Sequence, residues 1–271
     1  MYKLMLITND KSMAQYAVDC GVDRIFVDTE INGKAMRQGH LDTLISDHNI
    51  ADVKRIREVR GDFEILVRIN PLHERTIEEV EMAIDYGADI IMLPMFYSSR
   101  EVKIVSDMIN GRAKFIPLVE TKAAIEDIKG VVDVEGVNEV HIGLNDLHLD
   151  MKLKFMFELL TNGVVEKAAK IINSKNLPFG IGGIAKLGEG LLPADLILSE
   201  HVRLGASCAI LSRSFHNNAS SLEELKQSEL GVEIEKIKKR VEDLTKADAS
   251  SLNAYRLRMC SVVQNILENK Q

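Results

Sequence analysis

Cysteine is scarce in this chain, and the few cysteines are far apart. Cys20, Cys208 and Cys260 are the three cysteines among 271 residues, and none of them belongs to a CxxC pair. Thiolate zinc sites and disulfide frameworks need closely patterned cysteines, so the sequence indicates neither. This usage fits a reducing compartment.

The sequence also lacks long apolar runs and an excess of basic residues. The apolar run in the N-terminal MYKLMLITND is too short for a secretory signal, and no segment approaches the roughly 18 apolar residues that span a bilayer. The formal net charge of -7 gives no general attraction to nucleic acid or anionic lipid. We therefore expect a cytoplasmic protein with neither a membrane nor a nucleic acid as partner.

Eight short apolar runs are present, separated by longer amphipathic stretches. Each run is rich in Ile, Val and Leu and nearly continuous, which is typical of parallel strands that are buried on both faces. The runs lie at 3–8, 24–29, 64–69, 89–94, 114–119, 139–144, 178–183 and 208–212.

The spacing of these runs predicts a closed barrel. Runs three to six begin at residues 64, 89, 114 and 139, a constant step of 25. A strand, a turn, a three-turn helix and a return loop need about that length. The stretches 73–87, 98–111 and 121–131 are amphipathic and carry capping residues, so we expect helices there. Alternating elements of this size favour a (β/α)8 TIM barrel over residues 1–216, with a doubly wound open sheet as the alternative.

Residues 217–271 differ from the rest of the chain. A polar stretch is followed by two charged amphipathic segments, 232–246 and 249–268, with no further strand. We interpret them as a C-terminal helical extension, which either caps the barrel or packs against another subunit.

Charged and amide side chains stand at the ends of several runs, where barrel enzymes place their chemistry. One carboxylate after a strand is often only a helix N-cap, but charges at several buried strand ends need partners. The residues concerned are Asp28, Glu30, Arg68, Asn70, Glu120, Asn145 and Asp146.

These residue types together suit a 2-keto acid. Carboxylates on neighbouring loops make an oxygen-rich site for Mg2+ or Mn2+, and the Arg68 guanidinium matches a substrate carboxylate in two contacts. Breaking the adjacent carbon–carbon bond leaves an enolate, whose charge a metal stabilises. Loop amides around Gly143 and Asn145 can add hydrogen-bond donors. The sequence thus predicts a metal-dependent lyase or aldolase.

Four stretches of the chain form a recognisable set: VRINP (67–71), IMLPMFYSSREV (91–102), PLVETKAAIEDI (117–128) and IGLNDLHLDM (142–151). With them the chain resembles the HpcH/HpaI aldolase and citrate lyase beta-subunit family, over about residues 20–215. The resemblance implies a pyruvate-kinase-like TIM barrel, a Mg2+ or Mn2+ cofactor, pyruvate-releasing aldol cleavage or acyl-CoA lysis, and a homo-oligomer with exchanged C-terminal helices. Arg68 matches the family's substrate-carboxylate arginine, and Glu120 and Asp146 match its metal-binding Glu and Asp.

The chain departs from the family pattern near the second run. Ile31 follows Glu30 where the aldolase branch carries a His base, and Met95 stands at the family's usual lysine. We therefore expect His40 or His48 of the same loop to replace the base, with Glu30 catalytic beside Arg68, although either His also suits a surface or capping role. The choice between an aldehyde and an acyl-CoA co-substrate stays open. The acidic and basic pattern of the lyase branch is matched only loosely, by Asp28, Glu30, Lys34 and Arg37.

The loops after the seventh and eighth runs lie where barrels often bind phosphate. We expect the amides of Gly182 and Gly183 to contact substrate, with Ser212 and Arg213 nearby, although tightly packed turns also explain such glycines. The alternatives are a non-catalytic or phosphate-ligand-binding barrel and phosphoenolpyruvate-type phosphoryl chemistry. A Schiff-base aldolase is disfavoured, because Lys114 stands at the wrong end of its run.

Overall fold

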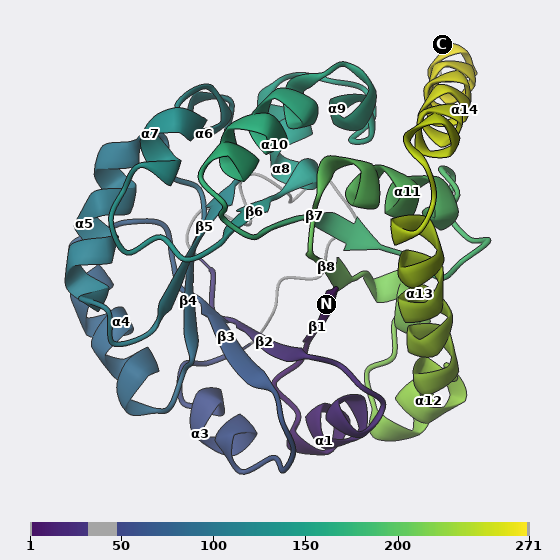
Figure 1. Ribbon diagram of the computed structural model, residues 1–271. Coiled ribbons are helices and arrows are strands. Elements are labelled where there is room, and N and C mark those ends of the chain that lie inside the picture. The colour runs from purple at the N-terminus through teal and green to yellow at the C-terminus, as the bar shows by residue number, and fades with distance from the viewer. Residues whose placement is uncertain (1, 32–47, 270–271) are drawn as a thin grey trace.

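The computed structural model describes residues 2–31 and 48–269. Within these residues eight parallel strands pair in sequence order, and β8 pairs with β1, so the sheet closes into a barrel (Figure 1). The predicted (β/α)8 barrel is confirmed, and the open sheet is excluded. The strands are β1 (Lys3–Ile7), β2 (Arg24–Asp28), β3 (Glu64–Arg68), β4 (Ile90–Leu93), β5 (Lys114–Val119), β6 (Val140–Ile142), β7 (Phe179–Ile184) and β8 (Cys208–Leu211).

Helices connect the strands and form the outer ring of the barrel (Figure 1). Those before β8 are α1 (Lys11–Asp19), α3 (Asp52–Arg57), α4 (Thr76–Asp85), α5 (Ser99–Ile109), α6 (Lys122–Glu126), α7 (Ile128–Val132), α8 (Leu144–Asp150), α9 (Glu158–Thr161), α10 (Val164–Ser174) and α11 (Ala194–Leu204).

Two apolar layers follow from the alternation of side chains along each strand. Leu4, Leu6 and Ile25 belong to the larger layer, where strands pack against helices. The residues between them face the barrel interior, which is filled by Met5, Phe26, Leu66, Ile90, Met92, Ile116, Leu118 and Cys208. The interior is therefore a packed core, and chemistry is confined to the two ends of the barrel.

Two local elements differ from the sequence prediction. The helix expected over 121–131 is divided at Asp127 into α6 and α7. The Asp127 carboxylate accepts the Ser99 N–H at 2.7 Å, a contact with α5 that no local pattern reveals. In addition, the polar segment after β6 forms the helix α8 directly, so Asp146 lies in a first helical turn rather than in an open loop.

The chain after β8 forms a short 3-10 turn, η1 (Arg213–His216), and the helices α12 (Leu222–Gln227), α13 (Leu230–Thr245) and α14 (Ala249–Glu268). These helices pack outside the barrel, with α13 and α14 against α11 and α12 against α1. Ion pairs between Arg240 and Asp195 (2.6 Å) and between Arg256 and Glu200 (2.9 Å) tie them to α11. The extension thus covers part of its own barrel, and its role between subunits stays a prediction. No helix in 2–31 or 48–269 has both the length and the apolar character needed to cross a membrane.

Candidate active site

A cavity of about 750 Å³ opens at the carboxyl ends of the barrel strands. Because all strands run parallel, residues that end different strands meet around this opening. Asp28 comes from β2, Arg68 from β3, Glu120 from the end of β5 and Asp146 from α8, and all four line the cavity. The structure therefore brings these four residues of the predicted rim together with Asn145, whereas Glu30 and Asn70 are not among the residues that line the cavity.

Arg68 is held by carboxylates from the neighbouring strand. Its Nε and Nη2 donate to the two oxygens of Asp28, each at 2.8 Å, and Nη1 lies 3.4 Å from Glu30. Asp28 and Arg68 are register partners of β2 and β3, which sets this alignment. Burial alone would lower the pKa of Arg68, but the charges of Asp28 and Glu30 raise it above its ordinary value. Arg68 is thus a fixed cation with one edge already occupied.

Glu120 is a buried carboxyl whose position is set by a backbone donor. It is 3% exposed, and its Oε1 accepts the N–H of Met95 at 3.0 Å. Met95 has a φ of 48°, a left-handed conformation that is uncommon for a residue with a side chain. Burial raises the pKa of Glu120 to about 8; Arg68 opposes this shift, and Asp146 and Glu30 add to it. Glu120 therefore lies in a place that favours a nearby cation.

Asp146 approaches Glu120 through the turn between β6 and α8. Gly143 is the N-cap of α8, and a β-carbon at this position would lie 3.0 Å from Glu120 Oε2. The glycine leaves room for the Glu120 carboxylate beside the first turn of the helix. In the described ranges no three His, Cys, Asp or Glu side chains converge as a complete metal cage. Two carboxylates with water and substrate oxygens would fit Mg2+ or Mn2+, which bind with few protein ligands.

Of the two histidines predicted as bases, only His48 lies within the described residues. His48 lines the cavity, and its Nδ1 accepts the backbone N–H of Asp28 at 2.9 Å. A backbone amide can only donate, so the proton of the neutral ring lies on Nε2. His40, Lys34 and Arg37 fall outside the described residues. Glu30 is buried beside Arg68 but is not among the residues that line the cavity.

The loops after β7 and β8, which the sequence predicted to contact substrate or phosphate, form another wall of the cavity. Gly182, Gly183, Ser212 and Arg213 all border it, as do Gly143 and Asn145. The pairing of β7 with β8 shifts register between Gly180 and Gly183, and Gly182 has a φ of 45°. This irregularity interrupts the regular pairing of β7 with β8 between Gly180 and Gly183, as a β-bulge does beside many active sites.

His141, which the sequence analysis did not single out, forms part of the cavity floor. It is 1% exposed, and its Nε2 lies 3.2 Å from the Gly182 carbonyl oxygen, to which it donates. Burial lowers its pKa to about 4, so the ring is neutral at neutral pH. The signal was present in the sequence, since Glu139, His141 and Gly143 alternate in a run that is otherwise apolar.

Comparison with known proteins shows the family of this chain. The model of the family HpcH/HpaI aldolase/citrate lyase matches residues 2–159, which is more than half of the chain. The chain therefore belongs to the HpcH/HpaI aldolase/citrate lyase family. A search of curated proteins finds no match.

Solved structures share the fold at low identity. An HpcH/HpaI aldolase from Desulfitobacterium hafniense DCB-2 has a TM-score of 0.63 and 15% identity, over 92% of this chain and 94% of that one. A family protein from Burkholderia cenocepacia J2315 has a TM-score of 0.63 and 14% identity, over 85% and 94%. The citrate synthase SbnG has a TM-score of 0.59 and 15% identity, over 89% and 95%.

Proposed function

We propose that this chain is a divalent-metal-dependent lyase or aldolase that cleaves or forms the carbon–carbon bond next to a 2-keto acid such as pyruvate or oxaloacetate. One observation supports the proposal: Glu120, Asp146 and the guanidinium of Arg68 line the same cavity, and the charges of Arg68 and Asp146 both act on the Glu120 carboxyl. Membership of the HpcH/HpaI aldolase/citrate lyase family supports the same class of reaction.

Glu120 and Asp146 would hold Mg2+ or Mn2+. When bound, such a cation supplies a Lewis acid for negative charge that develops on the keto oxygen. Glu120 is buried and the charge of half-buried Asp146 acts on it, so a divalent cation held by the two carboxyls would offset their repulsion. The Met95 N–H and the small Gly143 keep the Glu120 carboxylate at this position.

Arg68 would bind the carboxylate of the keto acid with the part of the guanidinium that Asp28 leaves open. Asp28 occupies Nε and one hydrogen of Nη2, so the substrate would meet the Nη1–Nη2 edge, next to Glu30. Gly143 and Asn145 would contact the substrate from the β6 side. The wall formed by Gly182 and Gly183 would border the co-substrate, an aldehyde or an acyl-CoA-type molecule.

His48 would orient a substrate oxygen. Because its Nδ1 accepts the Asp28 amide, the neutral ring holds its proton on Nε2. That N–H would donate a hydrogen bond to the oxygen, whereas the neutral ring in this tautomer has no lone pair free to act as the base. Glu30 would act indirectly, by keeping Arg68 charged and oriented.

The test is calorimetric titration of the chain with pyruvate and with oxaloacetate, in Mg2+, in Mn2+ and in EDTA. We expect binding that needs the metal and is lost in Glu120→Gln. Glu126→Gln, which changes an exposed carboxyl on α6, is the matched control. Keto-acid binding that is equal in EDTA, or unchanged in Glu120→Gln, would contradict the metal assignment. Absence of binding under all conditions would favour the non-catalytic or phosphate-ligand alternative.

A further inference from the structure

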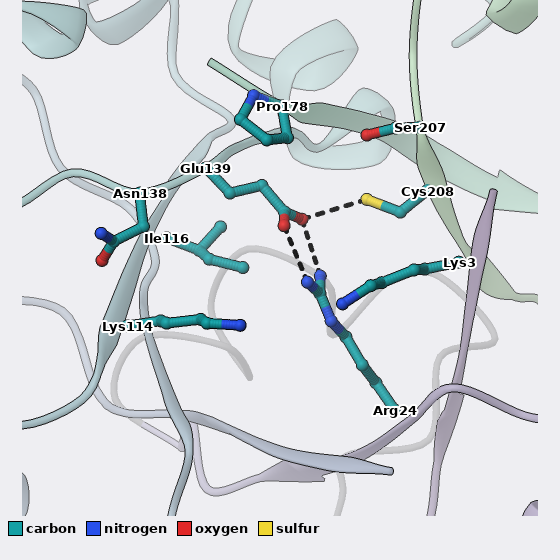
Figure 2. Close-up of a pocket in the computed structure, with 9 residues that line it drawn as sticks. All are labelled: Lys3, Arg24, Lys114, Ile116, Asn138, Glu139, Pro178, Ser207 and Cys208. Carbon is teal, nitrogen blue, oxygen red and sulfur yellow. Dashed lines mark hydrogen bonds and ion pairs between the residues drawn. The ribbon is translucent and has the colours of Figure 1, made fainter. Parts of the chain in front are cut away.

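A second cavity, of about 470 Å³, lies at the amino ends of the strands, opposite the candidate active site. Lys3, Arg24, Lys114 and Cys208 each begin a strand and line this cavity (Figure 2). Asn138 and Glu139 precede β6, and Pro178 precedes β7. We call this space the lower cavity. The reaction proposed above uses none of these residues.

Arg24 and Glu139 form a neutral pair at the inner side of the lower cavity. The Arg24 side chain is 2% exposed, and its two terminal nitrogens donate to the two oxygens of Glu139 at 2.7 and 2.8 Å (Figure 2). The Cys208 thiol donates to the same carboxylate at 3.1 Å. This pair therefore leaves no charge for a further ion.

The remaining charges around the lower cavity do not balance. Glu64 is one carboxylate shared by three cations: it accepts Lys3 at 2.7 Å, Arg24 at 2.9 Å and also Lys114. Burial would raise the pKa of Glu64, but these cations lower it to about 2, so it is ionised at neutral pH. With Arg24 matched by Glu139, two ammonium groups share a single negative charge.

Nearby acidic groups do not remove this excess. Asp23 lies 3.5 Å from the ammonium of Lys238, and Asp89 lies 2.5 Å from the guanidinium of Arg57. Each of these carboxylates has a cation of its own. The lower cavity thus carries a net charge of about +1, counted from formal charges at neutral pH.

The two ammonium groups also have hydrogen-bond capacity to spare. An ammonium has three N–H donors, and among the described residues Lys3 and Lys114 each have Glu64 as their partner. Figure 2 shows both side chains directed inward, toward the Arg24 guanidinium, from opposite sides of the cavity. Their side chains are 37% and 54% exposed, so an entering molecule can reach them.

The wall of the lower cavity is apolar where it meets the barrel interior. Ile116 belongs to the interior core, and Pro178 lies beside the start of β7. A cationic rim over an apolar wall fits a molecule with an anionic group and a carbon skeleton better than it fits an inorganic ion alone. We propose that the lower cavity binds a small organic dianion, whose carboxylate or phosphate group contacts Lys3 and Lys114.

The proposal is tested by titrating the full chain with succinate and with a small phosphate ester, glycerol 3-phosphate, at constant ionic strength. Acetate is the monoanion control. The double variant Lys3→Met with Lys114→Met should weaken dianion binding by at least about tenfold, because it changes the net charge from about +1 to about -1. Glu64→Gln should strengthen binding several-fold, because it removes the competing carboxylate.

The two variants act in opposite directions, so a general loss of folding cannot imitate the result. Lys103→Met, which removes an exposed lysine paired with Asp107 on α5, should leave binding unchanged. Succinate and the phosphate ester distinguish the two anion chemistries by their affinities. Dianion binding that is unchanged in the double variant would overturn the proposal. So would dianion binding that is lost only in Arg68→Lys, a variant of the candidate active site. So would acetate binding as tightly as both dianions.

Discussion

Glu120→Gln is expected to make the metal-free chain more stable at neutral pH while it abolishes binding of Mg2+ or Mn2+. The carboxyl is 3% exposed, and burial, reinforced by Asp146 and Glu30, raises its pKa to about 8. Glutamine keeps an oxygen that can accept the Met95 N–H but carries no charge. The folded chain then no longer needs to bury an ionisable group beside like charges.

The size of the effect and its pH window follow from the pKa. The ordinary value is 4.5, so between 4.5 and about 8 the folded chain binds more protons than the unfolded chain. Stability from this group is fully present below pH 4.5 and is lost as the pH rises through about 8. At about 1.4 kcal/mol per pKa unit, the loss at pH 7 is about 3 kcal/mol.

Urea unfolding in EDTA from about pH 5 to about pH 9 measures this difference. As the pH rises, the free energy of unfolding of the wild-type chain should fall relative to that of Glu120→Gln. Added Mn2+ should stabilise the wild-type chain and not Glu120→Gln. Glu126→Gln is the control and should follow the wild-type curve. A glutamine variant that is less stable than the wild-type chain at high pH, or parallel curves for the two, would refute the reasoning.

Three further outcomes follow from the contacts around the cavity. Arg68→Lys should raise the KM for the keto acid about tenfold, because an ammonium lacks the planar fork that meets Asp28 with one edge and a substrate carboxylate with the other; an unchanged KM would contradict the role. Gly180→Ala should lower the free energy of unfolding by about 1–3 kcal/mol, as its β-carbon would lie 2.3 Å from His141 Nδ1 and 2.4 Å from Cys208 Sγ. Thermal unfolding would show this, and an unchanged Tm would count against it. Acid should destabilise the chain through His141, whose pKa burial lowers from 6.5 to about 4. The stability that the neutral His141 ring contributes is complete above pH 6.5 and is lost as the pH falls through about 4. The free energy of unfolding should fall by up to about 3 kcal/mol over this range. The free energy of unfolding of His141→Gln should therefore depend less on pH in acid.

The barrel could be predicted because its strands are continuous apolar runs at regular spacing. Parallel topology then places Arg68, Glu120 and Asp146 at one end without any further information. The pairing of these side chains could not be read in the same way. The contact of Arg68 with Asp28 depends on the register of β2 against β3, across 40 residues of chain.

The lower cavity was missed for a different reason. Lys3, Arg24 and Lys114 stand at the first positions of apolar runs, whereas barrel enzymes place their chemistry where the runs end. Each of them, alone, is an ordinary charged residue at a strand start. Only closure of the barrel brings β1, β2 and β5 around one carboxylate, Glu64, and leaves the charges unequal.

Met95 contributes its backbone amide to the Glu120 carboxylate, and its side chain takes no part in that hydrogen bond. A replacement at this position that tolerates a left-handed backbone would keep the same anchor. The side chain at position 95 can therefore change without loss of the hydrogen bond that holds the Glu120 carboxylate in place.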